Sequence, residues 1–155
     1  MNEKITVIGA GSFGTALAVL LAGKEFDVSL WGRKKSQIAL MKDTRENPHY
    51  LPGVKLPENL KLSDDMEACL CGAKTVVFSV PAQSFRSVLE TAKKFMEPGA
   101  AVVNVAKGIE KGTLMRLSQI AEEIVPDIRY AALSGPSHAE EVARQLPTTV
   151  TVASK

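Results

Sequence analysis

Three glycines near the N-terminus have a spacing that can bind a phosphate. Residues 9–14 read G-A-G-S-F-G, directly after the β-branched and apolar segment 4–8 and at the start of a helical pattern. In that setting Gly9 permits a tight turn, Gly11 lets the backbone approach a pyrophosphate, and Gly14 lets the helix pack closely on the strand. The first N–H groups of the helix would receive the anion. The pattern favours dinucleotide binding over a glycine turn that holds no ligand.

Basic residues stand where many NAD-binding sites have an acidic one. A second apolar segment, 27–31, runs into Gly32-Arg33-Lys34-Lys35. An Asp or Glu at this place commonly binds the ribose hydroxyls, and it would repel a 2′-phosphate. Arg33 can instead meet a 2′-phosphate with a fork of donors, so the sequence predicts NADP as cofactor, with NAD also possible. The alternative is a solvated helix start.

A lysine follows the strand-like segment 100–106. In a parallel sheet this puts Lys107 at the carboxyl edge, where ligands bind in such folds. Lys107 is therefore the best catalytic candidate. Spacing alone leaves a surface lysine as an equal alternative.

The segment from Leu133 to Glu140 ends an expected strand and starts an expected helix. Ser137 and Glu140 have the spacing of a capping box, so a structural role explains both. The same helix start could instead receive a phosphate, although a filled cap leaves fewer free N–H groups. His138 is interpreted as a helix residue rather than as a general base.

Strands and helices are expected to alternate along the chain. The glycine and proline breaks and the apolar periodicity predict strands at 4–8, 27–31, 75–80, 100–106, 129–133 and 148–153, and helices at 13–22, 36–42, 64–72, 81–96, 113–124 and 137–145. Gly23 is expected to end a helix in a left-handed conformation, and Asp64 to cap another. Residues 48–57, with three prolines, are expected to be an exposed loop. The alternation predicts a Rossmann-like, doubly wound α/β fold, with a mainly parallel sheet and helices on both faces.

Length and composition exclude several classes of protein. The 155 residues suit one domain, 1–155, and the net charge of +2 is too weak to indicate a nucleic-acid or membrane surface. The longest apolar run, 16–22, falls well short of the roughly 20 residues of a membrane helix, so no membrane insertion is expected. Cys69 and Cys71 are interpreted as reduced thiols, and no metal site is predicted. A cytoplasmic protein is the simplest interpretation.

Several motifs together resemble one enzyme family. The lysine motif Lys107-Gly108-Ile109-Glu110 and the run Ser134-Gly135-Pro136-Ser137 are more specific than the glycine loop, which many dehydrogenases share. The matching segments, in the family's order, are 7–18, 30–33, 50–54, 80–81, 107–110, 133–141 and 146–149. They resemble the cofactor domain of bacterial NAD(P)-dependent glycerol-3-phosphate dehydrogenases.

The resemblance implies reversible reduction of dihydroxyacetone phosphate, a small phosphate ester, to sn-glycerol 3-phosphate for phospholipid synthesis. Hydride would pass between the nicotinamide and the carbonyl carbon. Lys107, Gly135 and Ser137 would contact the substrate. The residues that would contact the cofactor are Ser12, Phe13, Arg33, Lys107 and Ala139, with Lys34 and Tyr50 as weaker assignments.

In that family the general acid or base is a lysine of a second, helical domain, which also supplies further phosphate ligands. The 155 residues do not include that domain, so we expect them to bind cofactor without turnover. The full-length protein would be the enzyme, and it could form a homodimer. Two other classes stay open: a nucleotide-sensing module without turnover, and another reductase of the same superfamily, such as one acting on a branched keto acid.

Overall fold

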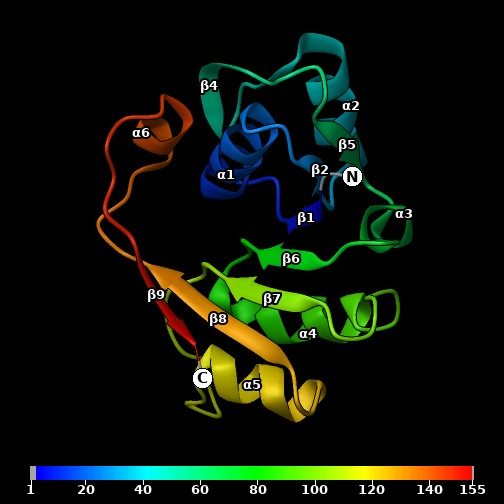
Figure 1. The fold of residues 1–155 in the computed structure, drawn as a ribbon, viewed down its shortest axis with the longest axis vertical. Coiled ribbons are helices and arrows are strands. Elements are labelled where there is room, and N and C mark those ends of the chain that lie inside the picture. Colours follow the sequence, from blue (N-terminus) through cyan, green and yellow to red (C-terminus); the bar gives the residue numbers. More distant parts are fainter. Residues whose placement is uncertain (1–2, 155) are drawn as a thin grey trace.

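Strands and helices alternate along residues 3–154, which the computed structural model describes (Figure 1). The strands are β1 (Lys4–Ile8), β2 (Asp27–Trp31), β3 (Glu46–Asn47), β4 (Leu51–Lys55), β5 (Lys61–Ser63), β6 (Thr75–Phe78), β7 (Ala101–Asn104), β8 (Arg129–Ser134) and β9 (Thr151–Ser154). The helices are α1 (Ser12–Gly23), α2 (Lys35–Thr44), α3 (Met66–Leu70), α4 (Ala82–Ala92), α5 (Leu117–Ile124) and α6 (Ala139–Ala143). The expected strands and helices occur in the expected order, whereas β3, β4 and β5 were not expected.

Seven strands form one sheet in the order β5-β2-β1-β6-β7-β8-β9. All pairs are parallel except β8 with β9, which is antiparallel. From β1 the chain first adds β2 on one side and later adds β6 on the other. Such a reversal opens a crevice at the carboxyl ends of the strands, where ligands bind in doubly wound folds. The predicted fold class is therefore confirmed.

Alternating side chains of the central strands pack into two separate hydrophobic cores. Val7 of β1 and Val77 of β6 pack in a core with residues of α1 and α2, whereas Ile8 and Phe78 pack in a core with residues of α4 and α5. This is the period of two expected for strands buried on both faces. Helices therefore cover both faces of the sheet.

The expected exposed loop at 48–57 is wrong in part. β4 pairs antiparallel with β3, and β5 joins the edge of the main sheet next to β2. Leu51 is fully buried because it packs against Ala16 of α1. Pro52, which removes a donor, is tolerated in this two-stranded ribbon, where few ladder bonds need an N–H.

Several expected helix ends also differ. Helix α4 ends at Ala92 instead of near residue 96, and α5 begins at Leu117 instead of near residue 113. The ends of α1 and α3 show smaller errors. Helix α1 does end at Gly23, but the left-handed residue is Glu25, with a φ of 65°. Helix α3 is capped by Asp65, whose carboxylate accepts from the N–H of Ala68 at 3.1 Å, rather than by Asp64. Both errors are shifts of one or two residues, within the usual uncertainty of helix ends.

We expect Phe85→Ala to lower the free energy of unfolding by about 3–5 kcal/mol, because it leaves a cavity in the core. Phe85 is fully buried, and its ring meets that of Phe78 edge-on with the centroids 5.4 Å apart. Urea unfolding followed by circular dichroism measures the change. Glu90→Ala, at an exposed position of the same helix, is the control. A loss for Phe85→Ala no larger than the control's would contradict this packing.

Candidate functional site

The glycine loop between β1 and α1 is shaped by close backbone approaches. Gly9 has a φ of +116°, and a Cβ there would lie 2.2 Å from the carbonyl oxygen of Ser79, which follows β6. A Cβ on Gly14 would lie 2.0 Å from the carbonyl oxygen of Gly9. A Cβ on Gly11 would have nothing within 4 Å. Gly9 and Gly14 are thus required by the protein's own packing, whereas the space beside Gly11 is open for a ligand.

The N-terminus of α1 can receive an anion. Gly11 is its N-cap residue, no side chain accepts from the first turn, and that turn contains no acidic residue. The first N–H groups of a helix have no partner within the helix and carry a partial positive charge. An anion placed at the open side of Gly11 would satisfy them.

Two side-chain amides fix the glycine loop from outside. Gln37 Nε2 of α2 and Asn47 Nδ2 of β3 both donate to the carbonyl oxygen of Ala10, at 2.7 Å and 3.1 Å. Asn47 is fully buried, and its Nδ2 also lies 2.9 Å from Thr15 Oγ1. Sequence reasoning missed both residues, because they lie 27 and 37 positions from Ala10 and belong to no motif.

A pocket of about 390 Å³ opens beside the start of α1 at the carboxyl edge of the sheet. It brings together five of the residues predicted to contact cofactor or substrate. Those residues are Ser12, Phe13, Lys107, Ser137 and Ala139. Ser79, Val80, Ser134 and His138 also line the pocket, and none of them was predicted as a site residue. Their positions in the sequence could have indicated this, because they directly follow β6, end β8 or precede α6, and ligands bind at the carboxyl edge of such sheets.

Lys107 lies against the segment that follows β8. Its Nζ donates to the carbonyl oxygen of Gly135 at 3.1 Å, and the same oxygen accepts from the N–H of Ser137 at 2.9 Å. Gly135 has a φ of +142°, and a Cβ there would lie 2.6 Å from the carbonyl oxygen of Thr149. The three residues predicted to bind substrate are therefore adjacent, and Gly135 cannot be replaced without displacing the chain.

The predicted capping box of Ser137 and Glu140 is wrong. Helix α6 begins at Ala139, and its N-cap is His138, with no side-chain cap. Ser137 belongs to a turn, because its N–H donates to the carbonyl of Gly135. The first helical hydrogen bond runs from the N–H of Val142 to the carbonyl of His138. The Ser137 side chain is thus not used as a helix cap, and the residue lines the pocket.

A second pocket, of about 550 Å³, lies at the start of α2. It contains the two weaker predictions, Lys34 and Tyr50, together with Ser36, Gln37, Leu40 and His49. Arg33 is exposed in the turn after β2 and lines neither pocket, although it directly precedes Lys34. The structure therefore brings the basic residues after β2 close to Tyr50 but leaves Arg33 outside the cavity.

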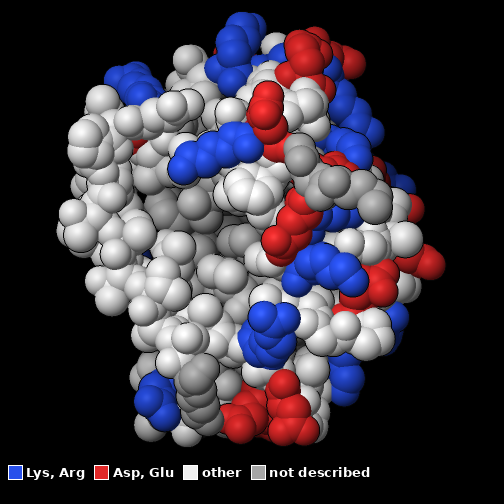
Figure 2. Space-filling model, in the orientation of Figure 1, with Lys and Arg blue, Asp and Glu red and all other residues white. Residues whose placement is uncertain are grey.

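Charges are mixed on the face that Figure 2 shows. Basic and acidic side chains alternate over α2, β5 and α3 at the right of the view, whereas the surface over α6 and β9 is mainly uncharged. This face therefore carries no extended basic patch.

The described residues give three further results. Among residues 3–154 no three His, Cys, Asp or Glu side chains are grouped so as to hold a metal ion. Within the same range no helix has the length and apolar character needed to cross a membrane. Cys69 is buried and Cys71 exposed, both as free thiols, and burial raises the pKa of the Cys69 thiol.

Comparison with known proteins identifies the family. Residues 4–155 match the family model described as the N-terminus of NAD-dependent glycerol-3-phosphate dehydrogenase. The glycerol-3-phosphate dehydrogenase (NAD(P)+) of Moorella thermoacetica is 52% identical over 153 residues, which are 99% of this chain and 45% of that protein. That of Syntrophomonas wolfei is 47% identical over 154 residues, 97% of this chain and 45% of the relative.

A solved structure agrees with these relatives. The crystal structure of glycerol-3-phosphate dehydrogenase from Coxiella burnetii superposes with a TM-score of 0.93 at 35% identity, over 99% of this chain and 47% of that one. The chain spans somewhat less than half the length of the relatives it matches. It belongs to the NAD-dependent glycerol-3-phosphate dehydrogenase family, whose N-terminal part it matches.

Proposed function

We propose that this chain is the cofactor-binding domain of an enzyme that interconverts sn-glycerol 3-phosphate and dihydroxyacetone phosphate. One observation carries the proposal: the uncapped start of α1 opens beside a pocket that also holds Lys107, Ser137 and Ala139. A helix start that can receive an anion thus lies beside Lys107, the lysine that we propose contacts the substrate, and this arrangement supports the proposal. The relatives' names supply the identity of the substrate.

The residues fit a nicotinamide dinucleotide, because the open space at Gly11 is where its pyrophosphate would approach the backbone. When bound, the cofactor supplies or accepts the hydride. Residues at three places would hold it. The glycine loop (Gly9, Gly11, Gly14) with Ser12 and Phe13 would hold the pyrophosphate end, Arg33, Lys34 and Tyr50 the adenosine end, and Lys107 and Ala139 the nicotinamide end. Arg33 favours NADP over NAD.

Lys107, Gly135 and Ser137 would hold the substrate. The Lys107 ammonium, 3.1 Å from the Gly135 carbonyl, would give a charge-assisted hydrogen bond to the phosphate ester and orient it in the pocket. Lys107 is the catalytic candidate of this chain. The proton donor to the substrate oxygen would come from a second, helical domain beyond these residues. We further propose a cytoplasmic location, consistent with two free thiols, and a role in glycerophospholipid synthesis. A homodimer of the full-length protein stays a prediction.

Gly11→Val should largely abolish nucleotide binding, because a branched side chain would fill the space that the pyrophosphate needs. The fold should survive, since a Cβ at Gly11 meets no atom within 4 Å. Calorimetric titration with NADPH measures the affinity, and circular dichroism checks folding. Unchanged affinity in the folded variant would overturn the assignment of the loop.

Arg33→Ala should lower the binding affinity for NADPH about tenfold or more and leave the affinity for NADH nearly unchanged. The lost charged hydrogen bond to the 2′-phosphate contributes about 1.5–3 kcal/mol, at the low end for an exposed group. Titration of the same variant with both cofactors is the measurement. Equal losses for the two cofactors would show that Arg33 does not recognise that phosphate.

Residues 1–155 alone should bind NADPH without turning over dihydroxyacetone phosphate. Without a positioned acid, hydride transfer to a carbonyl is typically slowed about 100- to 10,000-fold. Loss of the second domain's phosphate ligands removes orientation as well. Nicotinamide absorbance after addition of dihydroxyacetone phosphate is the readout, with a full-length relative as reference. Turnover near that of the reference would contradict the assignment of the acid to another domain.

A further inference from the structure

The segment that carries Lys107 is outside the regular elements. Lys107 is exposed, and the chain turns directly after it at Gly108, which has a φ of +120°. The following residues close on themselves through backbone bonds, from the N–H of Glu110 to the carbonyl of Met115 and from that of Leu114 to Glu110, both at 3.0 Å. Before Lys107 the chain is fixed up to Ala106, because the N–H of Val105 donates to the carbonyl of Phe78 and the Asn104 amide bonds Ala106. After Lys107 the backbone pairs within the loop itself, through the bridge of Ile109 with Arg116, and does not extend the sheet.

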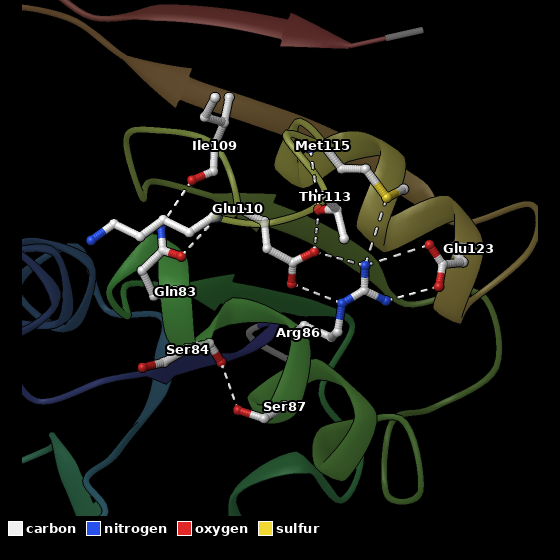
Figure 3. A network of polar contacts seen from close by, with 10 residues as sticks. Gln83, Ser84, Arg86, Ser87, Ile109, Glu110, Thr113, Met115 and Glu123 are labelled. Carbon is white, nitrogen blue, oxygen red and sulfur yellow. Dashed lines mark hydrogen bonds and ion pairs between the residues drawn. The ribbon is translucent and has the colours of Figure 1, made fainter.

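Gln83, in the first turn of α4, binds this loop at two points. Its Nε2 donates to the carbonyl oxygen of Ile109 at 2.8 Å, and its Oε1 accepts from the N–H of Lys111 at 2.9 Å (Figure 3). The amide thus pairs with the loop backbone as a neighbouring strand would. Its contacts begin two residues after Lys107.

Arg86, one helical turn later on the same face of α4, binds the loop a second time. Its Nε and one terminal nitrogen donate to the two carboxylate oxygens of Glu110 at 2.8 Å and 3.0 Å (Figure 3). Thr113 Oγ1 donates to the same carboxylate at 2.6 Å. These bonds lower the pKa of Glu110 to about 2, chiefly through the Arg86 guanidinium, so the carboxylate stays charged at any pH at which the protein works.

We propose that Gln83 and Arg86 are positioning residues for Lys107, holding its loop on α4 so that the ammonium stays at the Gly135 carbonyl and the substrate pocket. This inference rests on the proposed function only for the use made of Lys107. The helix that packs Phe85 into the core also carries these two anchors, so the rigid body of the fold sets the position of the ammonium.

A purely structural role is the competing explanation, and it applies differently to the two residues. Arg86 also binds Glu123 of α5, at 2.8 Å, and therefore ties two helices together. Within residues 3–154 the side-chain hydrogen bonds of Gln83 reach Ile109 and Lys111 and no other residue. Gln83→Met, which keeps the length of the side chain but removes both bonds, is thus the discriminating variant. Glu90→Gln, exposed on the same helix, is its control.

The first measurement needs no ligand. In the 155-residue chain labelled with 15N-lysine, the Nζ signal of Lys107 is assigned by its disappearance in Lys107→Met. Gln83→Met should raise the exchange of the ammonium protons with water about tenfold, as expected for loss of a hydrogen bond of average strength. Glu90→Gln should leave the exchange unchanged. An unchanged Lys107 signal in folded Gln83→Met overturns the proposal.

The second measurement is a double-mutant cycle on NADPH affinity. Gln83→Met alone should weaken binding several-fold, and it should cause no further loss in a Lys107→Met background, because a positioning residue acts only through the lysine. Additive losses would overturn the proposal in favour of a structural role. Arg86→Lys, which keeps the charge but not the paired hydrogen bonds, should repeat the pattern of Gln83→Met.

The two measurements separate this inference from the proposed function. If the wild-type chain binds no NADPH but the exchange of Lys107 responds to Gln83→Met, the anchoring is confirmed and the cofactor assignment fails. If NADPH binds and neither the exchange nor the affinity responds, the cofactor assignment stands and the anchoring is wrong.

Discussion

The site depends on one close contact between backbones. Because Gly14 has no side chain, α1 can begin directly against the carbonyl of Gly9, and because Gly9 has none, that turn can lie against Ser79 after β6. At either glycine there is no room even for a methyl group. These close approaches put the start of α1 at the point where the strand order reverses, so the partial positive charge of the helix faces the crevice. A bulkier residue at either glycine would move the helix start away from the pocket.

The two faces of the sheet contribute different parts of the site. The face with α1 and α2 supplies the glycine loop, the two amides on the Ala10 carbonyl and the second pocket. The face with α4 and α5 contributes no helix residue to the lining of the two pockets described above, but it anchors the loop of Lys107. The lysine then reaches over the sheet edge to Gly135. The glycine loop and the loop of Lys107 are thus tied to separate cores on the two faces of the sheet.

Sequence patterns predicted those features that depend on neighbours along the chain. Apolar runs predicted the strands of the main sheet except β5, and the glycine spacing predicted the turn between β1 and α1, because both are local. The ribbon of β3 and β4 was missed, since its burial comes from Leu51 meeting Ala16 across the fold. The helix cap at Ser137 was predicted wrongly because Ser137 lies in a turn, in which its N–H donates to the carbonyl of Gly135. Residue spacing alone does not reveal this turn. Gln37, Asn47 and Gln83 act over 26 to 37 residues of separation, beyond the reach of any motif.

The paired amides on Ala10 have an effect on affinity. A peptide plane next to a glycine rotates easily, and an anion that binds to a freely rotating N–H group must first immobilise it. With Gln37 and Asn47 both donating to its carbonyl oxygen, the peptide between Ala10 and Gly11 is held in one orientation by the folded protein itself. The entropy of ordering that peptide is therefore lost during folding rather than during association. That peptide is preorganised, and a pyrophosphate at the proposed site would meet an N–H of Gly11 that already points in one direction.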